Sequence, residues 1–221
     1  MRSLILPCAL AGTALLTAAC GSYANTVSSD VQMPQSNGPN PQNLPDPNTV
    51  PKPSTPYGYA VSLSPVTIEE VMVDPVGPNT GNQYVELYNS SSFDSDVGGW
   101  VVTNGVDTFT FPYGFRVKAG ERVVMYVGAA GTATANAQFA PSFSDLPIGT
   151  GSLALLRSGT DLVDFVQWGT SPNSMEGSAV LVHEWKAGDF VPVANEGRTY
   201  NYDGTASDST AWHAGSPTPG N

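Results

Sequence analysis

Residues 83–89 read QYVELYN, a run in which side chains of two kinds alternate. In an extended strand, Val85 and Leu87 fall on one face, and the polar and aromatic side chains between them fall on the other. Asn89 ends the run before three serines, where its side chain can hydrogen-bond to its own backbone in a turn. The pattern predicts a β-strand with one face on a hydrophobic core.

Similar runs recur on both sides of this stretch, separated by turns rich in Gly, Pro, Asn and Asp. We expect strands at 66–73, 83–89, 99–103, 108–111, 122–128, 152–157 and 162–168. Strand periodicity weakens after this point, and no long helical periodicity is present. Short strands at this spacing predict an all-β domain over 65–221, an immunoglobulin-like β-sandwich followed by an irregular C-terminal arm.

Several motifs in this region resemble the lamin-tail domain family. They are QYVELYN (83–89), VGGWVV (97–102), FTFPYG (109–114), KAGERVV (118–124), GSLALL (151–156), VDFVQWG (163–169) and an ending from GRTY (197–200) to PTPGN (217–221). The sequence departs from the family at Gln83, where Glu is usual, and at Val97, where Leu is usual. The resemblance covers roughly 66–221, and it implies a lamin-tail-type immunoglobulin-like sandwich without catalytic activity.

The motifs also have a physical interpretation. Trp100 follows two glycines, which let the chain bend closely over a large ring that we expect to be buried. Pro112 ends a strand because it has no N–H to donate. We expect Arg198 to pair with Glu86 or Asp164 and so to fix the C-terminal arm.

The N-terminus carries an apolar run at 4–19 behind Arg2. The run is too short to span a bilayer comfortably, which is typical of a signal peptide. The segment LTAAC, ending at Cys20, resembles the bacterial lipoprotein processing box. The resemblance implies cleavage after 1–19, a diacylglyceryl thioether on the Cys20 sulfur and usually a third acyl chain, such as palmitate, on the new N-terminus. We therefore expect an exported, lipid-anchored protein at the bacterial outer membrane or cell surface. The alternative is an ordinary secretory signal with a chance cysteine.

Residues 20–64 are rich in Pro, Asn and Ser and poor in apolar side chains. Such a segment cannot offset its ordering entropy, so it predicts a disordered linker. We interpret it as a stalk that lifts the domain from the membrane, although a spacer without a selected length has the same composition.

Charge and cysteine content exclude several classes of function. Removing 1–19 leaves 7 basic and 19 acidic residues, a balance of −12 that repels nucleic acid and anionic headgroups. The chain has only Cys8 and Cys20, and neither would remain as a free thiol. Thiol catalysis and cysteine-based zinc sites are therefore excluded.

The residue patterns of common hydrolases are absent. His183-Glu184 has no second histidine four residues on, and no G-x-S-x-G motif occurs. Glu69 and Glu70 are expected on opposite faces of a strand, so they could not flank one bond. A site using His183 and His213 for a metal, or a Ser-His-Asp triad, remains an alternative.

Two oxygen-rich loops are candidates for calcium, and otherwise we expect no cofactor. The first contains Asp94 and Asp96, and the second contains Asp203 and Asp208. Hard cations prefer such ligands, although neither loop matches an EF-hand and solvated turns have the same composition.

Aromatic residues gather in the C-terminal third. Trp185, Tyr200, Tyr202 and Trp212 could form an exposed face that binds sugar rings or a protein. The alternative, which we favour, is that they cover the end of the sandwich core.

These observations predict a lipid-anchored envelope protein that displays a non-catalytic domain for binding or scaffolding. Its partners would be the membrane, through the lipid, and an envelope glycan or protein, with no nucleic acid. The alternative is an accessory subunit that tethers a secreted hydrolase, and a hydrolase in its own right is a weaker one. The fold alone does not identify a ligand.

Overall fold

A computed structural model describes residues 64–159 and 161–221 of the chain. The expected signal peptide at 1–19, the lipidation site Cys20 and the linker as far as residue 63 lie outside the described residues. Within the described part, the helical segments are too short or too polar to cross a bilayer.

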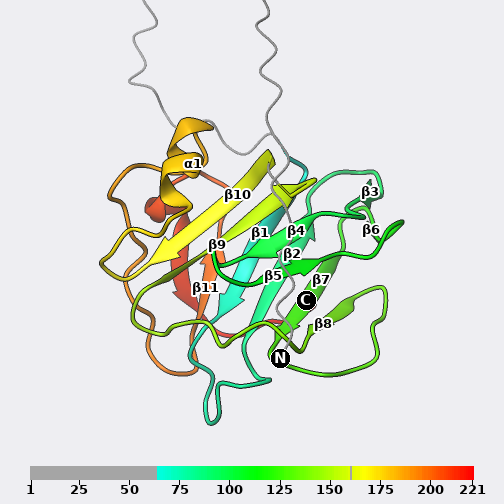
Figure 1. The fold of residues 1–221 in the computed structure, drawn as a ribbon, viewed down its shortest axis with the longest axis horizontal. Helices are drawn as coiled ribbons and strands as arrows, with labels where there is room; N and C mark the ends of the chain where they lie inside the picture. Colours follow the sequence, from blue (N-terminus) through cyan, green and yellow to red (C-terminus); the bar gives the residue numbers. More distant parts are fainter. Residues whose placement is uncertain (1–63, 160) are drawn as a thin grey trace, which may run out of the picture. The chain divides into compact units, whose positions relative to one another are not determined.

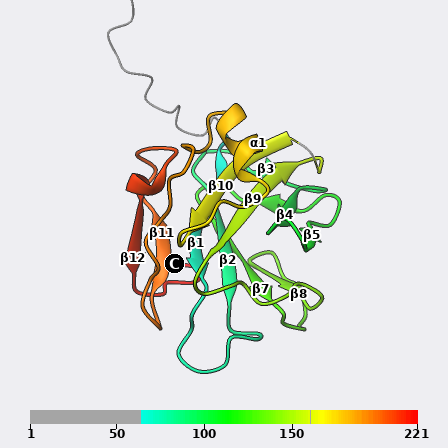
Figure 2. The same ribbon diagram turned by 60° about the vertical axis from the view of Figure 1, so that its left-hand side comes forward.

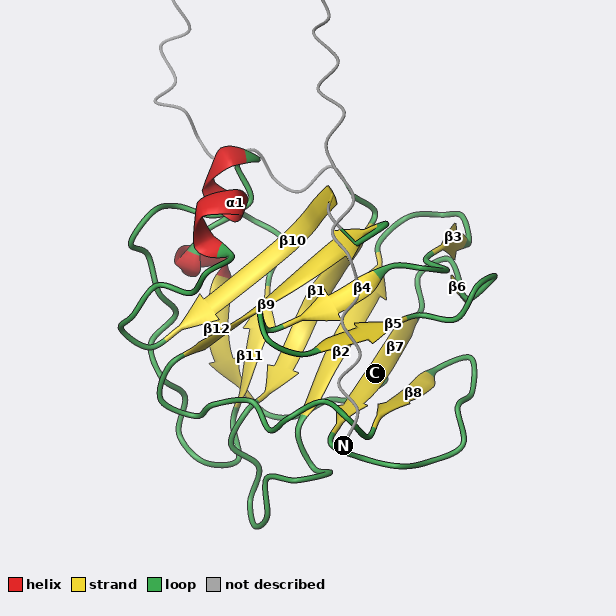
Figure 3. Ribbon diagram, viewed as in Figure 1, coloured by secondary structure: helices red, strands yellow, loops and turns green. Residues whose placement is uncertain are grey.

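Strands dominate the domain (Figure 1, Figure 3). They are β1 (Val66–Met72), β2 (Tyr84–Asn89), β3 (Ser95–Asp96), β4 (Val101–Thr103), β5 (Thr108–Thr110), β6 (Arg116–Val117), β7 (Arg122–Val127), β8 (Ala137–Ala140), β9 (Gly151–Arg157), β10 (Asp161–Trp168), β11 (Thr199–Tyr202) and β12 (Trp212–Gly215). One short α-helix, α1 (Glu176–Leu181), and one 3-10 turn, η2 (Ser209–Ala211), belong to the same described part. The all-β class predicted from the alternating runs is confirmed.

Two sheets form the sandwich. The larger has the strand order β12-β11-β1-β2-β7-β8, and the smaller has the order β10-β9-β4-β5. Figure 1 and Figure 2 show the smaller sheet lying across the larger one, with α1 beside the end of β10. The buried side chains of both sheets form one hydrophobic cluster between them. A two-stranded ribbon of β3 and β6 lies at the side.

Both faces of β2 are covered, which differs from the expected half-buried strand. Val85 and Leu87 lie in the sandwich core, as the alternation predicts. On the opposite face, Tyr84 and Glu86 are also buried. The C-terminal residues from 218 to 220 cover this face.

The C-terminal region is less irregular than expected. Residues 169–198 contain only α1 as regular structure, but β11 then pairs with β1, placing Tyr200 opposite Val71. β12 pairs with β11 and forms the edge of the six-stranded sheet. At the other edge, β8 runs parallel to β7. These strands are short, and their positions depend on pairing with distant partners rather than on a strong local pattern.

Two β-bulges face each other across the sandwich. One lies in β1 between Ile68 and Glu70, and the other lies in β10 between Leu162 and Asp164. The buried Asp164 carboxylate accepts hydrogen bonds from the Ile68 N–H at 2.6 Å and the Phe165 N–H at 2.8 Å. One side chain of the smaller sheet thereby satisfies a backbone donor of the larger sheet.

Candidate functional site

An open groove of about 510 Å³ lies at the rim of the smaller sheet, where β4 begins and β9 ends. Its lining residues are Gly98, Gly99, Trp100, Val101, Tyr113, Arg157, Ser158 and Gly159. Strand register explains why segments far apart in sequence meet here. Val101 pairs with Leu156, so the residues just outside this pair, Trp100 and Arg157, are brought together.

Two of the residues that line the groove are glycines in places where a side chain would not fit or would be strained. A Cβ at Gly98 would lie 2.6 Å from the backbone nitrogen of Gly114, which no side chain could tolerate. Gly99 has a φ of +81°, and its Cβ position would be 3.6 Å from the Tyr113 ring. Glycine at 98 therefore lets two backbone segments approach closely, and the positive φ at 99 favours glycine there.

The aromatic rings of the groove differ in exposure. Trp100 is partly buried and packs against the core, so the expectation of a fully buried ring is wrong. Tyr113 is 97% exposed because it occupies the turn that Pro112 begins, where the Phe115 N–H bonds to the Pro112 carbonyl at 3.0 Å. One ring is thus anchored and the other is free to meet a ligand.

Arg157 supplies the charge of the groove. Its Cζ lies 5.5 Å from the centroid of the Trp100 ring, within the range of a cation–π contact. Its Nε lies 3.8 Å from an oxygen of Asp161, and both side chains are about half exposed. Such an exposed pair is weak and leaves most guanidinium donors available. The lining residues contain no acidic side chain, although the chain has a net charge of −11.

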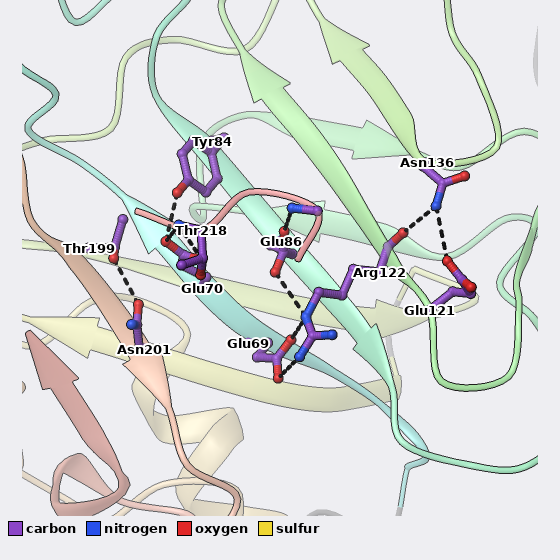
Figure 4. A network of polar contacts seen from close by, with 11 residues as sticks. Glu69, Glu70, Tyr84, Glu86, Glu121, Arg122, Asn136, Thr199, Asn201 and Thr218 are labelled. Atoms are coloured by element: carbon purple, nitrogen blue, oxygen red, sulfur yellow. Dashed lines mark hydrogen bonds and ion pairs between the residues drawn. The ribbon is translucent and has the colours of Figure 1, made fainter. Parts of the chain in front are cut away.

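A second polar region lies on the outer face of the larger sheet (Figure 4). The bulge in β1 brings Glu69 and Glu70 to this same face, where Glu86 of β2 joins them. The expectation that Glu69 and Glu70 point to opposite faces is therefore wrong, because strict alternation does not continue through a bulge.

Arg122 of β7 neutralises part of this cluster. It binds Glu69 through Nε at 2.6 Å and through a terminal nitrogen at 2.8 Å, and its Nε lies 3.3 Å from Glu86 (Figure 4). The expected pairing of Arg198 with Glu86 or Asp164 is not what the structure shows. Arg198 instead donates to the Ser216 hydroxyl at 3.2 Å, because it lies at the start of the β11–β12 pair.

The C-terminal residues cover the cluster. The Glu70 carboxylate accepts hydrogen bonds from the Tyr84 hydroxyl at 2.7 Å, the Thr218 N–H at 3.0 Å and the Thr218 hydroxyl at 2.8 Å. The Gly220 N–H donates to Glu86. Burial raises the pKa of the Glu86 carboxyl to about 7, and burial with the neighbouring Glu70 raises the pKa of Tyr84 above its usual range. These carboxylates hold the chain in place, so we call this region the carboxylate clamp (Glu69, Glu70, Glu86 and Arg122).

The sequence model of the Lamin Tail Domain family matches residues 61–170. The domain belongs to this family. The match runs from β1 to β10 and includes every residue that lines the groove. No curated protein matches the chain. The immunoglobulin-like fold of the Lamin Tail Domain family agrees with the observed sandwich. Membership in the family indicates a non-catalytic binding or scaffolding domain.

The four aspartates considered for calcium mostly stabilise turns of the lamin tail domain. Asp94 accepts from the Ala119 N–H at 3.1 Å, and Asp96 accepts from the Gly98 N–H at 2.9 Å. Asp203 accepts from the Thr205 N–H at 2.9 Å, and Asp208 caps η2. Within residues 64–159 and 161–221, no three His, Cys, Asp or Glu side chains are grouped to hold a metal ion. Calcium binding remains a prediction.

The histidines have separate surroundings in the described lamin tail domain. His213 Nε2 lies 2.8 Å from Asp203, and both are on the surface. The Thr205 hydrogen bond and the contact with His213 lower the pKa of Asp203. His183 follows α1 with a positive φ of 64°.

Three of the four aromatic residues predicted as a binding face lie in the core of the lamin tail domain. Trp185, Tyr200 and Trp212 are buried, and Tyr202 is partly buried. Trp185 packs edge-on against Phe165 at 5.5 Å between ring centroids. The prediction of an exposed face at these positions is wrong: β11 and β12 bury Tyr200 and Trp212, and Trp185, after α1, is buried with its Nε1 donating to the Asp189 carbonyl. The favoured alternative, that they cover the core, is what the structure shows.

The groove residues were not predicted as a site. Tyr113 and Arg157 are far apart in sequence. The pairing of β4 with β5 brings the Tyr113 turn beside Trp100, and the pairing of β4 with β9 brings Arg157 to the same rim. One local signal was present in the sequence. A tyrosine directly after Pro112 and before a glycine occupies the tip of a turn, where a large ring is exposed.

Proposed function

We propose that this protein is a non-catalytic binding module, held at the cell envelope by a lipid on Cys20, which binds its partner in the groove of Trp100, Tyr113 and Arg157. The observation that carries the proposal is that the exposed Tyr113 and Arg157 line the same groove. Among the described residues, Arg157 forms an ion pair only with Asp161, at 3.8 Å, and both side chains are exposed. Side chains of this kind are enriched where proteins meet ligands.

The chemistry of the groove favours binding over catalysis. Its lining residues carry two hydroxyls, on Tyr113 and Ser158, and include no His, Asp, Glu or Cys that could act as a base for either. The acidic residues with raised pKa values lie elsewhere and have protein partners. Glu86 is in the carboxylate clamp, and Asp164 accepts two backbone N–H groups.

The anchor part of the proposal rests on sequence. The segment ending at Cys20 resembles a lipoprotein processing box, and the proline-rich residues that follow are suited to a stalk. An envelope glycan or protein is then the expected partner, because a net charge of −11 opposes nucleic acid.

Two experiments on the full chain test the proposal. Radiolabelled palmitate should be incorporated by the wild-type protein, and the Cys20→Ser variant should not be labelled and should leave the membrane fraction. Separately, the purified chain should capture an envelope component, and Trp100→Ala or Tyr113→Ala should abolish the capture.

Phe93→Ala is the matched control, because Phe93 is also an exposed aromatic residue, at 77%, and does not line the groove. Capture that is unchanged in both groove variants would contradict the proposed site. Capture of a secreted hydrolase would instead support a tethering role. Repeating the assay with a chelator tests whether calcium contributes.

A further inference from the structure

We propose that the groove recognises an anionic sugar ring, meaning one pyranose unit that carries a carboxylate or a phosphate. This inference rests on the proposed function, and it assigns the chemical class of the ligand. The structure places a cation and two aromatic rings in one groove, whose other lining residues include three glycines.

The aromatic part of the groove suits a sugar ring. One face of a pyranose is apolar and packs on an aromatic face, while its hydroxyls remain in water. Trp100 is held by its contact with the core, and Tyr113 lies across Gly99 with its ring exposed. The volume of about 510 Å³ falls within the range of about 300–1,000 Å³ that is usual for small-ligand clefts.

The charge of the groove selects an anionic ring over a neutral one. Arg157 offers a planar fork of donors that matches carboxylate and phosphate oxygens in a bidentate geometry. Its contact with Trp100 at 5.5 Å positions the guanidinium beside the aromatic surface. Among the described residues, Asp161 is the acid within 4 Å of the guanidinium, at 3.8 Å. Both side chains are about half exposed, so the ion pair is weak and an anionic ligand can replace Asp161.

The net charge of the chain limits the kind of ligand. A balance of −11 repels a densely charged polymer at long range, although screening acts beyond about 8 Å at physiological salt. A single acidic unit in an otherwise neutral glycan gains the short-range pairing with Arg157 and avoids most of the repulsion. We therefore expect recognition of an isolated or terminal acidic residue.

The test is isothermal titration of the full chain with three matched trisaccharides. They end in glucuronic acid, in glucose 6-phosphate or in glucose, and are otherwise identical. We expect at least one of the anionic trisaccharides to bind about tenfold or more tightly than the neutral one, in line with charge-assisted hydrogen bonds. The two anionic probes show whether the preferred group is the carboxylate or the phosphate.

Two variants separate the contribution of the Arg157 charge from that of the Tyr113 ring. Arg157→Gln should remove the preference for the anionic trisaccharides and keep the weaker binding of the neutral one. Tyr113→Ala should weaken the binding of every trisaccharide that the wild-type protein binds by about tenfold or more, as expected for loss of an aromatic anchor. Lys186→Gln and Phe93→Ala are the matched controls, since both residues are exposed and neither lines the groove.

The outcomes separate this inference from the proposed function. Equal binding of the neutral and anionic trisaccharides, or a preference that survives Arg157→Gln, would overturn the anionic-sugar assignment. If no trisaccharide binds while groove variants still abolish capture from the envelope, the assignment fails and the binding module stands. If capture is also independent of the groove, both fail.

Discussion

The carboxylate clamp and the groove use polar side chains in opposite ways. In the clamp, Glu70 accepts three hydrogen bonds and Glu69 is paired with Arg122, all within the fold. In the groove, Arg157 has one long and exposed ion pair and Tyr113 is almost fully exposed. The clamp therefore contributes to stability and the groove is available to a partner.

This difference shows that charge density does not identify the functional surface. The carboxylate clamp is the denser group of charges, yet its carboxylates serve the fold. The groove contains one charged residue, but that residue and its aromatic neighbours are accessible. Changes in the clamp should alter stability, and changes in the groove should alter binding.

The largest effect is expected when the cation of the clamp is removed. Arg122→Met leaves Glu69 and the buried Glu86 without their ion pair. Breaking a buried pair costs about 3–5 kcal/mol, and partial exposure of Arg122 lowers the expectation to about 2–3 kcal/mol. Urea unfolding measures the loss. Arg157→Met is the control from the groove and should change stability by less than about 0.5 kcal/mol. Equal losses would remove the distinction between the two regions.

A smaller loss is expected when residues 218–221 are deleted. Glu70 and Glu86 then lose the donors from Thr218 and Gly220, and water can replace them only in part. A buried acceptor without its partner costs about 1–3 kcal/mol, so we expect about 2 kcal/mol by urea unfolding. Thr218→Val removes only the hydroxyl and should cost less than the deletion. A deletion without effect would show that this segment does not stabilise the sheet.

Stability should also fall as the pH rises from about 5 to 8. Burial raises the pKa of Glu86 and Asp164 to about 7, and burial with the charge of Asp164 raises that of Glu184 to about 8. Their folded-state values lie above the unfolded ones, so the folded protein binds more protons in this range. The stability is fully present below about pH 4 and is lost as the pH passes the folded values.

We expect a progressive decrease in the free energy of unfolding across this range, measured by urea unfolding at each pH. Glu86→Gln should reduce the slope, because an amide does not titrate. A stability that is constant or rises from pH 5 to 8 would contradict the assignment of these raised pKa values.

The smallest effect on stability is expected in the groove itself. Tyr113→Ala removes a side chain that is 97% exposed, so unfolding should change by less than about 0.5 kcal/mol. The same variant should no longer capture the envelope component. A large loss of stability would mean that Tyr113 belongs to the fold and not to a binding surface.

The strand framework was predictable because most strands carry their own pattern. The runs at 83–89 and 122–128 match β2 and β7 to within a residue at either end, since alternating apolar residues mark the core face. Five strands were missed: β3, β6, β8, β11 and β12. Ala137–Ala140 and Thr199–Tyr202 have four residues each, too few to show a period without their partners β7 and β1.

The bulge in β1 left a signal that strict alternation hides. Val66 and Ile68 face the core two residues apart, but the next core residue is Val71, three residues on. This phase shift marks an extra residue and places Glu69 and Glu70 on one face. The groove had no equivalent signal, because Trp100 was expected to be buried and its contact with Arg157 depends on the register of β4 and β9.

The position of β1 in the larger sheet has a consequence for the timing of folding. β1 is the first described strand, yet it lies between β2 and β11, and its Ile68 N–H bonds to Asp164, 96 positions away. Such non-local contacts slow folding to the order of milliseconds to seconds, because loops must close before the contacts form. The sheet cannot be completed until its last strands have been synthesised. A chain whose sheet forms this late remains unfolded while it is synthesised, which suits export to the cell envelope where we propose that it is anchored.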